Sequence, residues 1–195
     1  ALLMGPRTYE QNVIPGMSTR MQRSVGEETY TGTKVVKLDK IVDTHYAFTL
    51  GDMVFELKKL VEKAHTQGDL VVYLPQKKVI FTGDLVFNDR LSSIRDGSII
   101  GSLKALDLID SMQAQVIVGG HGYVTDANAT VSLRRYLSEM KKQILEALSN
   151  DVSIDQITKH VTMPEYKNMK LYDVLHDRNV FEAYRELEMY DEDEE

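Results

Sequence analysis

The sequence predicts an α/β protein in which a mixed sheet is packed by helices. Short β-branched and aromatic runs, separated by turn residues, occupy residues 35–81. After Gly97 the apolar residues recur at spacings of three and four, which is the helical period. One more short apolar run at residues 116–118 interrupts the helical part. The order along the chain is a group of strands followed by a helix, a strand and a helix. This order predicts a sandwich-like layering of sheet and helices.

Residues 1–33 carry few regular signals, because glycine and proline interrupt every apolar pattern. The interrupting residues are Gly5, Pro6, Pro15, Gly16, Gly26 and Gly32. They predict an irregular or weakly helical stretch. We interpret residues 1–33 as a linker-like excursion whose two ends are both attached to other parts of a domain.

Five apolar runs predict the strands of the sheet. They span residues 35–38, 46–50, 53–57, 70–74 and 79–81. Gly51-Asp52 lies between the second and third runs and predicts a tight hairpin. A turn is expected at residues 75–78, between the last two runs. Short β-branched runs separated by such turns predict a sheet with a buried face.

Helices are predicted on both sides of the run at residues 116–118. The first has an apolar stripe made of Ile99, Leu103, Leu106, Ile109 and Met112. The second is long and amphipathic, with Thr125 or Asp126 as its candidate cap. Its apolar residues are Leu133, Tyr136, Leu137, Met140, Ile144 and Leu148.

A break at Asn150-Asp151 precedes a short helix expected over about 153–160 and a last one over about 171–188. We therefore divide the chain into residues 1–33, a domain part at residues 34–150, and a helical C-terminal extension at residues 151–195 that ends in an acidic tail.

The formal net charge of −7 is confined to the last ten residues. Residues 186–195 hold seven acids and no Lys or Arg, so 23 acids and 23 bases remain in the rest of the chain. A neutral body offers no electrostatic footprint for nucleic acid. No apolar run approaches the length that crosses a bilayer, so we expect neither nucleic acid nor membrane as a partner. We interpret the tail as a frayed, solvated helix end, with a cation or partner site as the alternative.

The sequence contains no cysteine, which restricts the chemistry it can carry. Disulfides, thiolate zinc sites, cysteine nucleophiles and iron–sulfur ligation are excluded for this chain. Any bound metal must be held by His, Asp or Glu.

Three such residues border predicted strands. His65 begins a polar turn before residues 70–74, Asp84 follows residues 79–81, and His121 lies among Gly119, Gly120 and Gly122. Glycines allow the backbone to approach a ligand or metal closely. Each residue alone is explained more simply as a capping Asp or an ordinary loop His. Together they predict a divalent-metal site at one edge of a rigid sheet.

Residues 65–75, 79–87 and 119–122 resemble the second half of the metallo-β-lactamase superfamily in order, spacing and flanking strands. The resemblance covers roughly residues 46–148 and implies half of an αββα sandwich. It implies that His65 completes the three-histidine set of a first metal, that Asp84 bridges two metals, and that His121 binds the second. The family's Pro-Gly-His-Thr reads Lys63-Ala64-His65-Thr66 here, a departure that leaves the ligand intact.

The activity implied by the resemblance is metal-assisted hydrolysis of a small-molecule ester, thioester, amide or related bond. Two zinc ions would activate a shared water as the nucleophile. Asp84 would hold the metal bridge and could take part in proton transfer.

The family's first motif, His-x-His-x-Asp-His, is absent from this chain. His45 is the only histidine upstream of His65, and it stands alone. A catalytic zinc takes three protein ligands besides its water, so three ligands shared by two metals make an incomplete site. We therefore expect a truncated and inactive fragment of a hydrolase, with partial or no zinc occupancy. The alternative is a natural half-domain without catalysis.

Half of a sandwich leaves an apolar face open to water. We expect this face to be covered by a homodimer contact or by association with the missing N-terminal half. In the second case the protein is a hydrolase whose two zinc sites are complete only in the intact parent. In the non-catalytic alternative the open face serves self-association.

Further residues are candidates for supporting the metal ligands. Thr66 and Asp69 could fix the imidazole tautomers, although simple turn capping is the alternative. His176 and Tyr172 could reach over the site from the C-terminal helices, or serve ordinary helix packing.

Substrate-binding candidates lie in the loops after the strands that carry ligands. They are Asn88, Arg90, Arg95 and Tyr123. Arg95 could clamp a carboxylate or phosphate or form a surface salt bridge. The Gly-Cys-Gly-Arg stretch of glyoxalase II and persulfide dioxygenase relatives does not follow Asp84, which disfavours those two branches.

Overall fold

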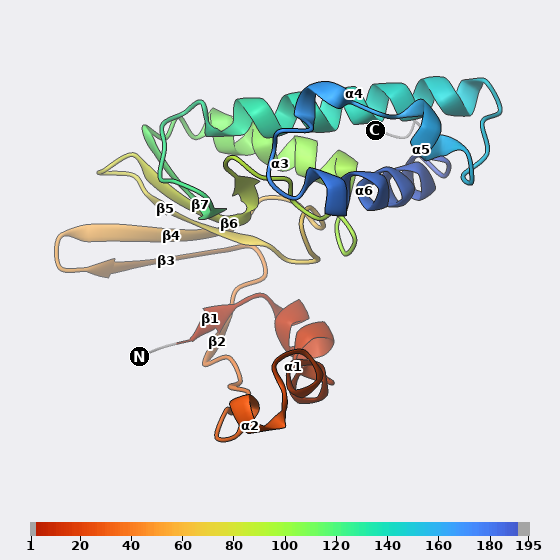
Figure 1. Ribbon diagram of the computed structural model, residues 1–195. Coiled ribbons are helices and arrows are strands. Elements are labelled where there is room, and N and C mark those ends of the chain that lie inside the picture. The colour runs from red at the N-terminus through yellow and green to blue at the C-terminus, as the bar shows by residue number, and fades with distance from the viewer. Residues whose placement is uncertain (1–2, 191–195) are drawn as a thin grey trace.

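The computed structural model describes residues 3–190 of the chain (Figure 1). The N-terminal lobe, residues 3–42, lies below the main sheet in this view. It contains β1 (Met4–Gly5), the π-helix η1 (Tyr9–Val13), α1 (Met17–Val25), α2 (Glu27–Tyr30) and β2 (Lys40–Ile41). β1 and β2 pair in parallel, so the two ends of the lobe meet.

The main sheet has five strands in the order in which they occur along the chain. They are β3 (His45–Leu50), β4 (Met53–Lys59), β5 (Leu70–Leu74), β6 (Val79–Phe87) and β7 (Val116–His121). Neighbouring strands are antiparallel except β6 and β7, which are parallel and joined through α3 (Ile99–Ser111). This arrangement confirms the predicted mixed sheet and the hairpin at Gly51-Asp52.

The two faces of the sheet differ in what covers them. One row of cross-strand partners runs through Glu56, Tyr73, Ile80 and Ile117, and its last two members are fully or almost fully buried under helices. The neighbouring row runs across all five strands and is apolar throughout: Tyr46, Leu57, Val72, Phe81 and Val118. On this second face Phe81 is 43% exposed.

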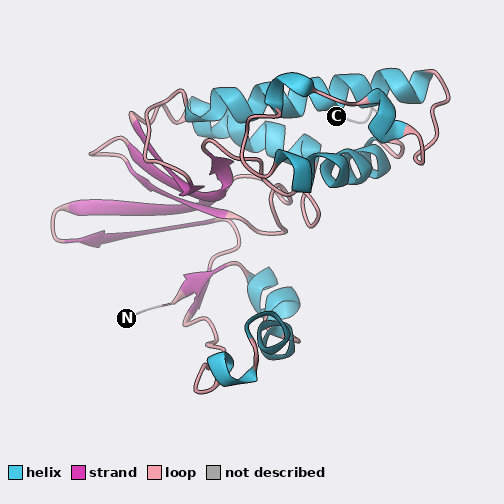
Figure 2. Ribbon diagram, in the orientation of Figure 1, coloured by secondary structure: helices cyan, strands magenta, loops and turns pink. Residues whose placement is uncertain are grey.

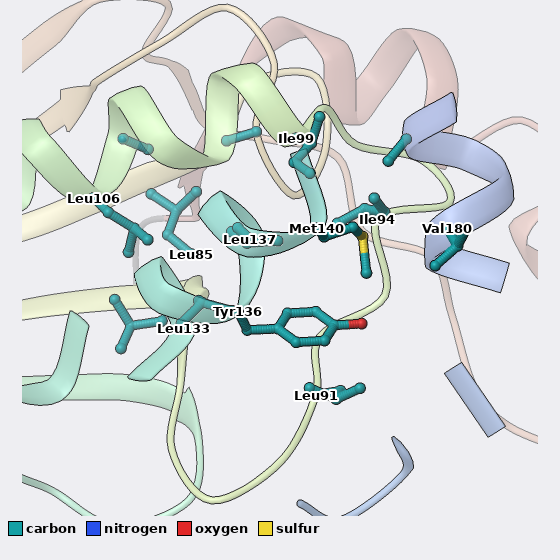
Figure 3. Packing of buried hydrophobic residues seen from close by; sticks show 14 of the residues in the cluster. Leu85, Leu91, Ile94, Ile99, Leu106, Leu133, Tyr136, Leu137, Met140 and Val180 are labelled. Atoms are coloured by element: carbon teal, nitrogen blue, oxygen red, sulfur yellow. The ribbon is translucent and has the colours of Figure 1, made fainter. Parts of the chain in front are cut away.

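The helices that follow β6 lie together on one side of the sheet (Figures 1 and 2). Besides α3 they are α4 (Ala129–Ser149), α5 (Ile157–His160), the 3-10 helix η2 (Pro164–Tyr166) and α6 (Tyr172–Leu187). Leu106, Leu133, Tyr136 and Met140 pack in the core between them (Figure 3). The predicted apolar stripes of α3 and α4 therefore face the core, as amphipathic helices require.

The C-terminal extension is bonded directly to the sheet domain. Glu186 on α6 accepts hydrogen bonds from the backbone N–H groups of Ile99 (2.8 Å) and Ile100 (3.3 Å), and from the Ser98 hydroxyl. These groups form the N-terminus of α3, where free N–H groups favour a negative charge. Glu186 is thus a helix cap and not part of a solvated tail, while residues 191–195 lie outside the described residues. The three-part division of the chain stays a prediction.

Two local predictions were wrong. Residues 35–38 form no strand, because no neighbouring strand offers them a hydrogen-bonding partner; the Leu38 N–H is bonded instead to the Glu10 carboxylate at 3.0 Å. The N-cap of α4 is Asn128, whose side chain makes no capping bond, and not Thr125 or Asp126. Asp126 accepts a bond from the Asn128 N–H at 2.9 Å and so stabilises the turn before the helix.

Within residues 3–190, no helix combines the length and apolar character needed to cross a membrane.

Candidate metal centre

Asp84 reaches the site because β6 is irregular around Gly83. The pairing of β6 with β7 shifts register on both sides of Gly83, and Gly83 has a φ of 53°. A bulge with a glycine in the left-handed region bends a strand and redirects the following side chain. The strand predicted at residues 79–81 thus continues to Phe87 and carries Asp84 within it.

Gly120 on β7 provides the space for the Asp84 carboxylate. A Cβ atom at residue 120 would lie 2.0 Å from Asp84 Oδ1, closer than any real contact. This explains physically why the chain has glycine beside the candidate ligand.

His121 is the last residue of β7, one position beyond Gly120. Its carbonyl oxygen accepts a bond from the Asn88 N–H at 3.1 Å, which holds the end of the strand. Its ring stacks on Phe87 with a centroid separation of 4.9 Å. These contacts keep the imidazole at the edge of the sheet.

His65 lies in the loop between β4 and β5. The preceding residue, Ala64, is fully buried, and its carbonyl accepts a bond from the Ser98 N–H at 2.7 Å. The His65 ring packs against the same Phe87, with centroids 5.8 Å apart. The loop histidine and the histidine on the strand thus pack against the same Phe87 ring.

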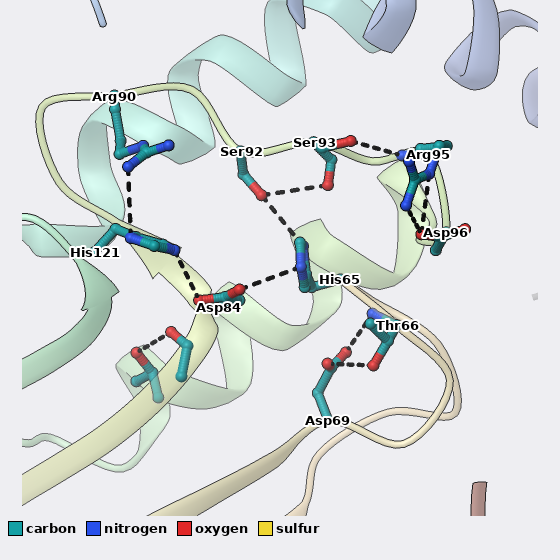
Figure 4. Close-up of polar contacts among 12 residues, drawn as sticks. His65, Thr66, Asp69, Asp84, Arg90, Ser92, Ser93, Arg95, Asp96 and His121 are labelled. Carbon is teal, nitrogen blue, oxygen red and sulfur yellow. Dashed lines mark hydrogen bonds and ion pairs between the residues drawn. The ribbon is translucent and has the colours of Figure 1, made fainter. Parts of the chain in front are cut away.

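The three predicted ligands meet around the Asp84 carboxylate (Figure 4). His65 Nε2 lies 3.4 Å from Asp84 Oδ2, and His121 Nε2 lies 3.6 Å from Oδ1. Zinc bonds of about 2.0–2.2 Å in tetrahedral geometry place neighbouring ligand atoms about 3.3–3.6 Å apart. Each imidazole and the carboxylate oxygen that it faces are thus spaced as two ligands of one zinc ion.

The donors suit zinc but are too few to complete a site. Side-chain exposures of 22% for His65, 39% for Asp84 and 45% for His121 leave the cluster open to solvent. Among residues 3–190 no group of three His, Asp or Glu side chains surrounds a single point. Each cation would receive two donors from these residues, one short of the three protein ligands of a catalytic zinc.

The two imidazoles have different second contacts through Nδ1. His65 Nδ1 lies 3.3 Å from the Ser92 hydroxyl, whereas His121 Nδ1 lies 3.5 Å from Arg90 Nη1. Arg90 Nε is buried and makes no hydrogen bond within the described residues.

Thr66 and Asp69 contact each other and not the imidazoles. The Thr66 hydroxyl donates to Asp69 Oδ1 at 2.6 Å, and the Thr66 N–H donates to Oδ2 at 2.8 Å. The structure thus places them in a capped turn next to His65. The residue beside the His65 ring nitrogen is Ser92, which the sequence analysis did not single out.

The substrate-binding candidates lie around the cluster. The Asn88 amide donates to the Tyr123 carbonyl oxygen at 2.9 Å, and the Tyr123 side chain is 75% exposed. Arg95 forms a surface ion pair with Asp96, with Nη2 to Oδ2 at 2.7 Å. The hydrogen bond from Arg95 lowers the pKa of the Asp96 carboxyl.

His176 and Tyr172 pack within the helices. The His176 ring stacks on Tyr172 at 4.4 Å, and its nitrogens contact the Tyr136 hydroxyl at 3.1 Å and the Val161 carbonyl oxygen at 2.9 Å. Burial lowers the pKa of the His176 imidazole. These contacts correspond to the packing interpretation.

Another part of α6 does approach the cluster. A cavity of about 450 Å³ is lined by His65 and by Leu175, Arg178 and Phe181 of α6. Helical periodicity could have indicated this face of α6, but no local signal pointed it toward His65.

A family model matches more than half of the chain. The model described as "Metallo-beta-lactamase superfamily" matches residues 6–121, which include all three candidate ligands.

Among curated proteins, the chain is similar to two hydroxyacylglutathione hydrolases. It is 30% identical over 102 residues to the protein of Brucella anthropi, a match that covers 52% of this chain and 38% of the relative. It is also 30% identical over 101 residues to the protein of Brucella ovis, covering 51% and 38%. The matched part therefore spans well under half the length of these relatives.

Two solved structures share the fold. A metallo-beta-lactamase from Pontibacter korlensis aligns with a TM-score of 0.52 and 21% identity, over 70% of this chain and 68% of its own. A metallo-beta-lactamase family protein from Thermus thermophilus aligns with a TM-score of 0.57 and 14% identity, over 76% and 56%. At these identities the likeness establishes the fold and not the activity.

Proposed function

Because this chain belongs to the metallo-beta-lactamase superfamily, we propose that it carries part of the active site of a zinc-dependent hydrolase. His65 and Asp84 belong to the first zinc site in this proposal, and Asp84 and His121 to the second. The described residues, 3–190, hold too few ligands for catalysis, so in this proposal the activity belongs to a protein that supplies further ligands.

The observation that carries the proposal is the position of Asp84 between the two imidazoles. Its two carboxylate oxygens each face a different Nε2 atom, at 3.4 and 3.6 Å. A capping aspartate would instead bond to backbone N–H groups. One carboxylate shared by two imidazoles suits a pair of divalent cations.

Zinc held by His65, Asp84 and His121 together with further ligands would lower the pKa of a bound water, so that hydroxide is available near neutral pH, and would polarise the substrate's reacting bond. The residues of this chain do the positioning. Phe87 packs against both imidazoles and keeps their Nε2 atoms toward Asp84. Asp84 is partly exposed, so solvent and substrate can reach its carboxylate.

The substrate in this proposal is a small molecule with an ester, thioester, amide or related bond. The matched curated relatives are named for hydroxyacylglutathione hydrolysis, which keeps thioesters in the panel to be tested. The segment after Asp84 reads Leu85-Val86-Phe87-Asn88-Asp89-Arg90 and lacks Gly-Cys-Gly-Arg. We therefore propose the reaction class and not this particular thioester.

The test compares the protein expressed from the complete reading frame with its Asp84→Asn variant. Both are loaded with zinc and assayed against a panel of p-nitrophenyl esters, thioesters and anilides. The proposal predicts hydrolysis that requires zinc and is lost in the variant, with no hydrolysis by residues 1–195 alone. Zinc-loaded full protein that hydrolyses nothing in the panel, or an Asp84→Asn variant that retains activity, would contradict it.

The second face of the sheet, on which Phe81 is 43% exposed while Leu57 is buried, favours a second candidate function, a non-catalytic module that self-associates. The row from Tyr46 to Val118 is apolar on every strand, and large apolar faces mark interaction sites. Sedimentation of residues 1–195 tests this candidate. It predicts a homodimer that Phe81→Asp converts to monomer, whereas a monomer at about 100 μM, well above the μM dissociation constants of weak specific complexes, would exclude it.

A further inference from the structure

Ser92 is the residue that contacts the Nδ1 atom of His65. It lies in the loop between β6 and α3 and is only 8% exposed. Its hydroxyl oxygen lies 3.3 Å from His65 Nδ1 and 3.4 Å from the Ser93 carbonyl oxygen (Figure 4).

These two contacts offer the hydroxyl proton two destinations, the Ser93 carbonyl oxygen and His65 Nδ1. A hydroxyl has one proton to donate, and the Ser93 carbonyl oxygen can only accept. When the Ser92 proton goes to Ser93, a lone pair of the hydroxyl oxygen faces His65 Nδ1. In that arrangement Nδ1 carries the imidazole proton and donates it, and the lone pair of Nε2 is directed at Asp84.

Asn179 on α6 holds Ser92 in this position. Its side-chain N–H group donates to the Ser92 carbonyl oxygen at 2.8 Å, and its side-chain oxygen accepts from the Ile94 N–H at 3.1 Å. Ser92 offers only an acceptor here and Ile94 only a donor, so the orientation of the Asn179 amide is determined. Asn179 is 1% exposed, and loss of either partner would leave a buried polar group unsatisfied.

We propose that Ser92 and Asn179 are positioning residues for His65: Asn179 fixes the loop, and Ser92 selects the tautomer in which Nε2 can bind a metal. The C-terminal helix α6 thereby contributes to the metal affinity of a site that lies at the edge of the sheet. The inference rests on the proposed function only in taking His65 as a metal ligand.

The expected size of the effect follows from the role of such contacts. A histidine that binds metal through one nitrogen needs the other nitrogen held as a donor, and losing that partner costs about tenfold to 100-fold in metal affinity. Ser92→Ala removes the acceptor and leaves the ring free to turn or to change tautomer. Asn179→Asp keeps the oxygen that accepts from Ile94 but replaces the donor to Ser92, so the loop shifts at residue 92.

The experiment uses residues 1–195 labelled with ¹⁵N and free of metal, at about pH 8.5, two units above the ordinary histidine pKa. The ¹⁵N chemical shifts of the His65 ring show which nitrogen carries the proton. Parent chain, Ser92→Ala, Asn179→Asp and the matched control Ser93→Ala are compared, and each is then titrated with zinc. Thermal unfolding verifies that every variant is folded.

The inference predicts that His65 is protonated on Nδ1 in the parent chain and in Ser93→Ala. It predicts that Ser92→Ala and Asn179→Asp shift the proton toward Nε2 and weaken zinc binding about tenfold to 100-fold. An unchanged His65 tautomer in folded Ser92→Ala, or an equal change in Ser93→Ala, would overturn it. If the tautomers behave as predicted but the parent chain binds no zinc, the positioning role stands and the zinc function fails.

Discussion

His65 and His121 face the same carboxylate, yet their surroundings prepare them differently for a metal. In the arrangement that we propose, the Ser92 hydroxyl accepts from Nδ1 of His65, so the Nε2 lone pair of that ring is available. The guanidinium of Arg90 beside Nδ1 of His121 can only donate. That contact favours a proton on Nε2 of His121, where a metal would have to bind.

Because the Nδ1 contacts of His65 and His121 differ, the two sides of the cluster are not equivalent. The His65 side is preorganised and less exposed, whereas the His121 side requires Arg90 to move or to exchange its contact for another acceptor. We therefore expect the first cation to bind between His65 and Asp84, and the second to bind more weakly between Asp84 and His121.

The largest expected effect comes from Asp84→Asn, which removes the ligand that both sides share. Losing a residue that only supports a metal ligand already lowers metal affinity about tenfold to 100-fold. Because Asp84 is itself a proposed ligand, we expect zinc affinity to fall by at least about 100-fold. Calorimetric zinc titration measures the effect. The control is Asp89→Asn, because Asp89 is near in sequence but pairs with Lys170 at 3.5 Å. Equal losses of zinc affinity in Asp84→Asn and Asp89→Asn would contradict the shared role of Asp84 on which the comparison of His65 and His121 rests.

Gly120→Ala tests whether the position of the Asp84 carboxylate, and not only its charge, matters. The new Cβ would lie 2.0 Å from Asp84 Oδ1 and must displace it, so we expect zinc affinity to fall about tenfold or more. Gly119→Ala is the matched control, because its Cβ would meet the Val86 carbonyl oxygen at 2.5 Å, and the only atom of a candidate ligand residue among its nearest neighbours is the His121 carbonyl oxygen, at an ordinary 3.6 Å. Both variants should lower the unfolding temperature, but only Gly120→Ala should weaken zinc binding in the folded state.

Arg90→Met tests the His121 side of the cluster alone. It removes one positive charge beside His121 and keeps an apolar stem, so we expect the second zinc to bind about threefold to tenfold more tightly. The zinc-dependent shifts of the His121 ring signals measure this affinity. Arg95→Met serves as control, since the Arg95 guanidinium is paired with Asp96. A weaker second zinc site in Arg90→Met would show that Arg90 supports the site and does not oppose it.

Both ring nitrogens of His176 contact polar groups of the protein, so this residue serves as a reference histidine. We expect its substitution to have the smallest effect of those considered. Burial lowers its pKa in the folded state, so below the ordinary value of about 6.5 the unfolded chain binds the proton first. The contribution of His176 to stability is therefore complete above about pH 6.5 and is lost as the pH falls through the folded-state pKa.

Urea unfolding between pH 8 and pH 5, a range that spans the ordinary histidine pKa, measures this effect. We expect His176→Gln to be less stable at pH 8 and to show a flatter decline toward acid than the parent chain. His160→Gln, at an exposed position, is the control. An equal decline in parent and His176→Gln would exclude His176 as a source of the acid sensitivity.

Local patterns in the sequence were sufficient for most of the elements and for the meeting of His65, Asp84 and His121 at one edge of the sheet. Alternating and helical periodicities located β3, β4, β5, α3 and α4, because each depends on residues that are neighbours in the chain. Residues 35–38 have strand propensity but no partner strand, and a strand requires both. His65, Asp84 and His121 were predicted because polar residues at the ends of neighbouring strands meet at one edge of a sheet.

The contacts that distinguish the two imidazoles could not be predicted from the sequence. Ser92 and His65 are 27 residues apart, Arg90 and His121 are 31 apart, and Asn179 and Ser92 are 87 apart. These pairs depend on how an irregular loop packs against α6, and no periodicity describes that loop. Thr66 and Asp69 show the opposite case, since a short-range bond between them replaced the expected contact with the imidazole.

The central claim is that His65, Asp84 and His121 form a binding site for divalent metal ions. A crystal structure of residues 1–195 with zinc, and an anomalous difference map recorded at the zinc absorption edge, tests it most directly. The account predicts a strong peak about 2.0–2.2 Å from His65 Nε2 and from an Asp84 oxygen, with a weaker peak on the His121 side. Zinc bound only elsewhere on the chain, with no peak beside Asp84, would contradict the account.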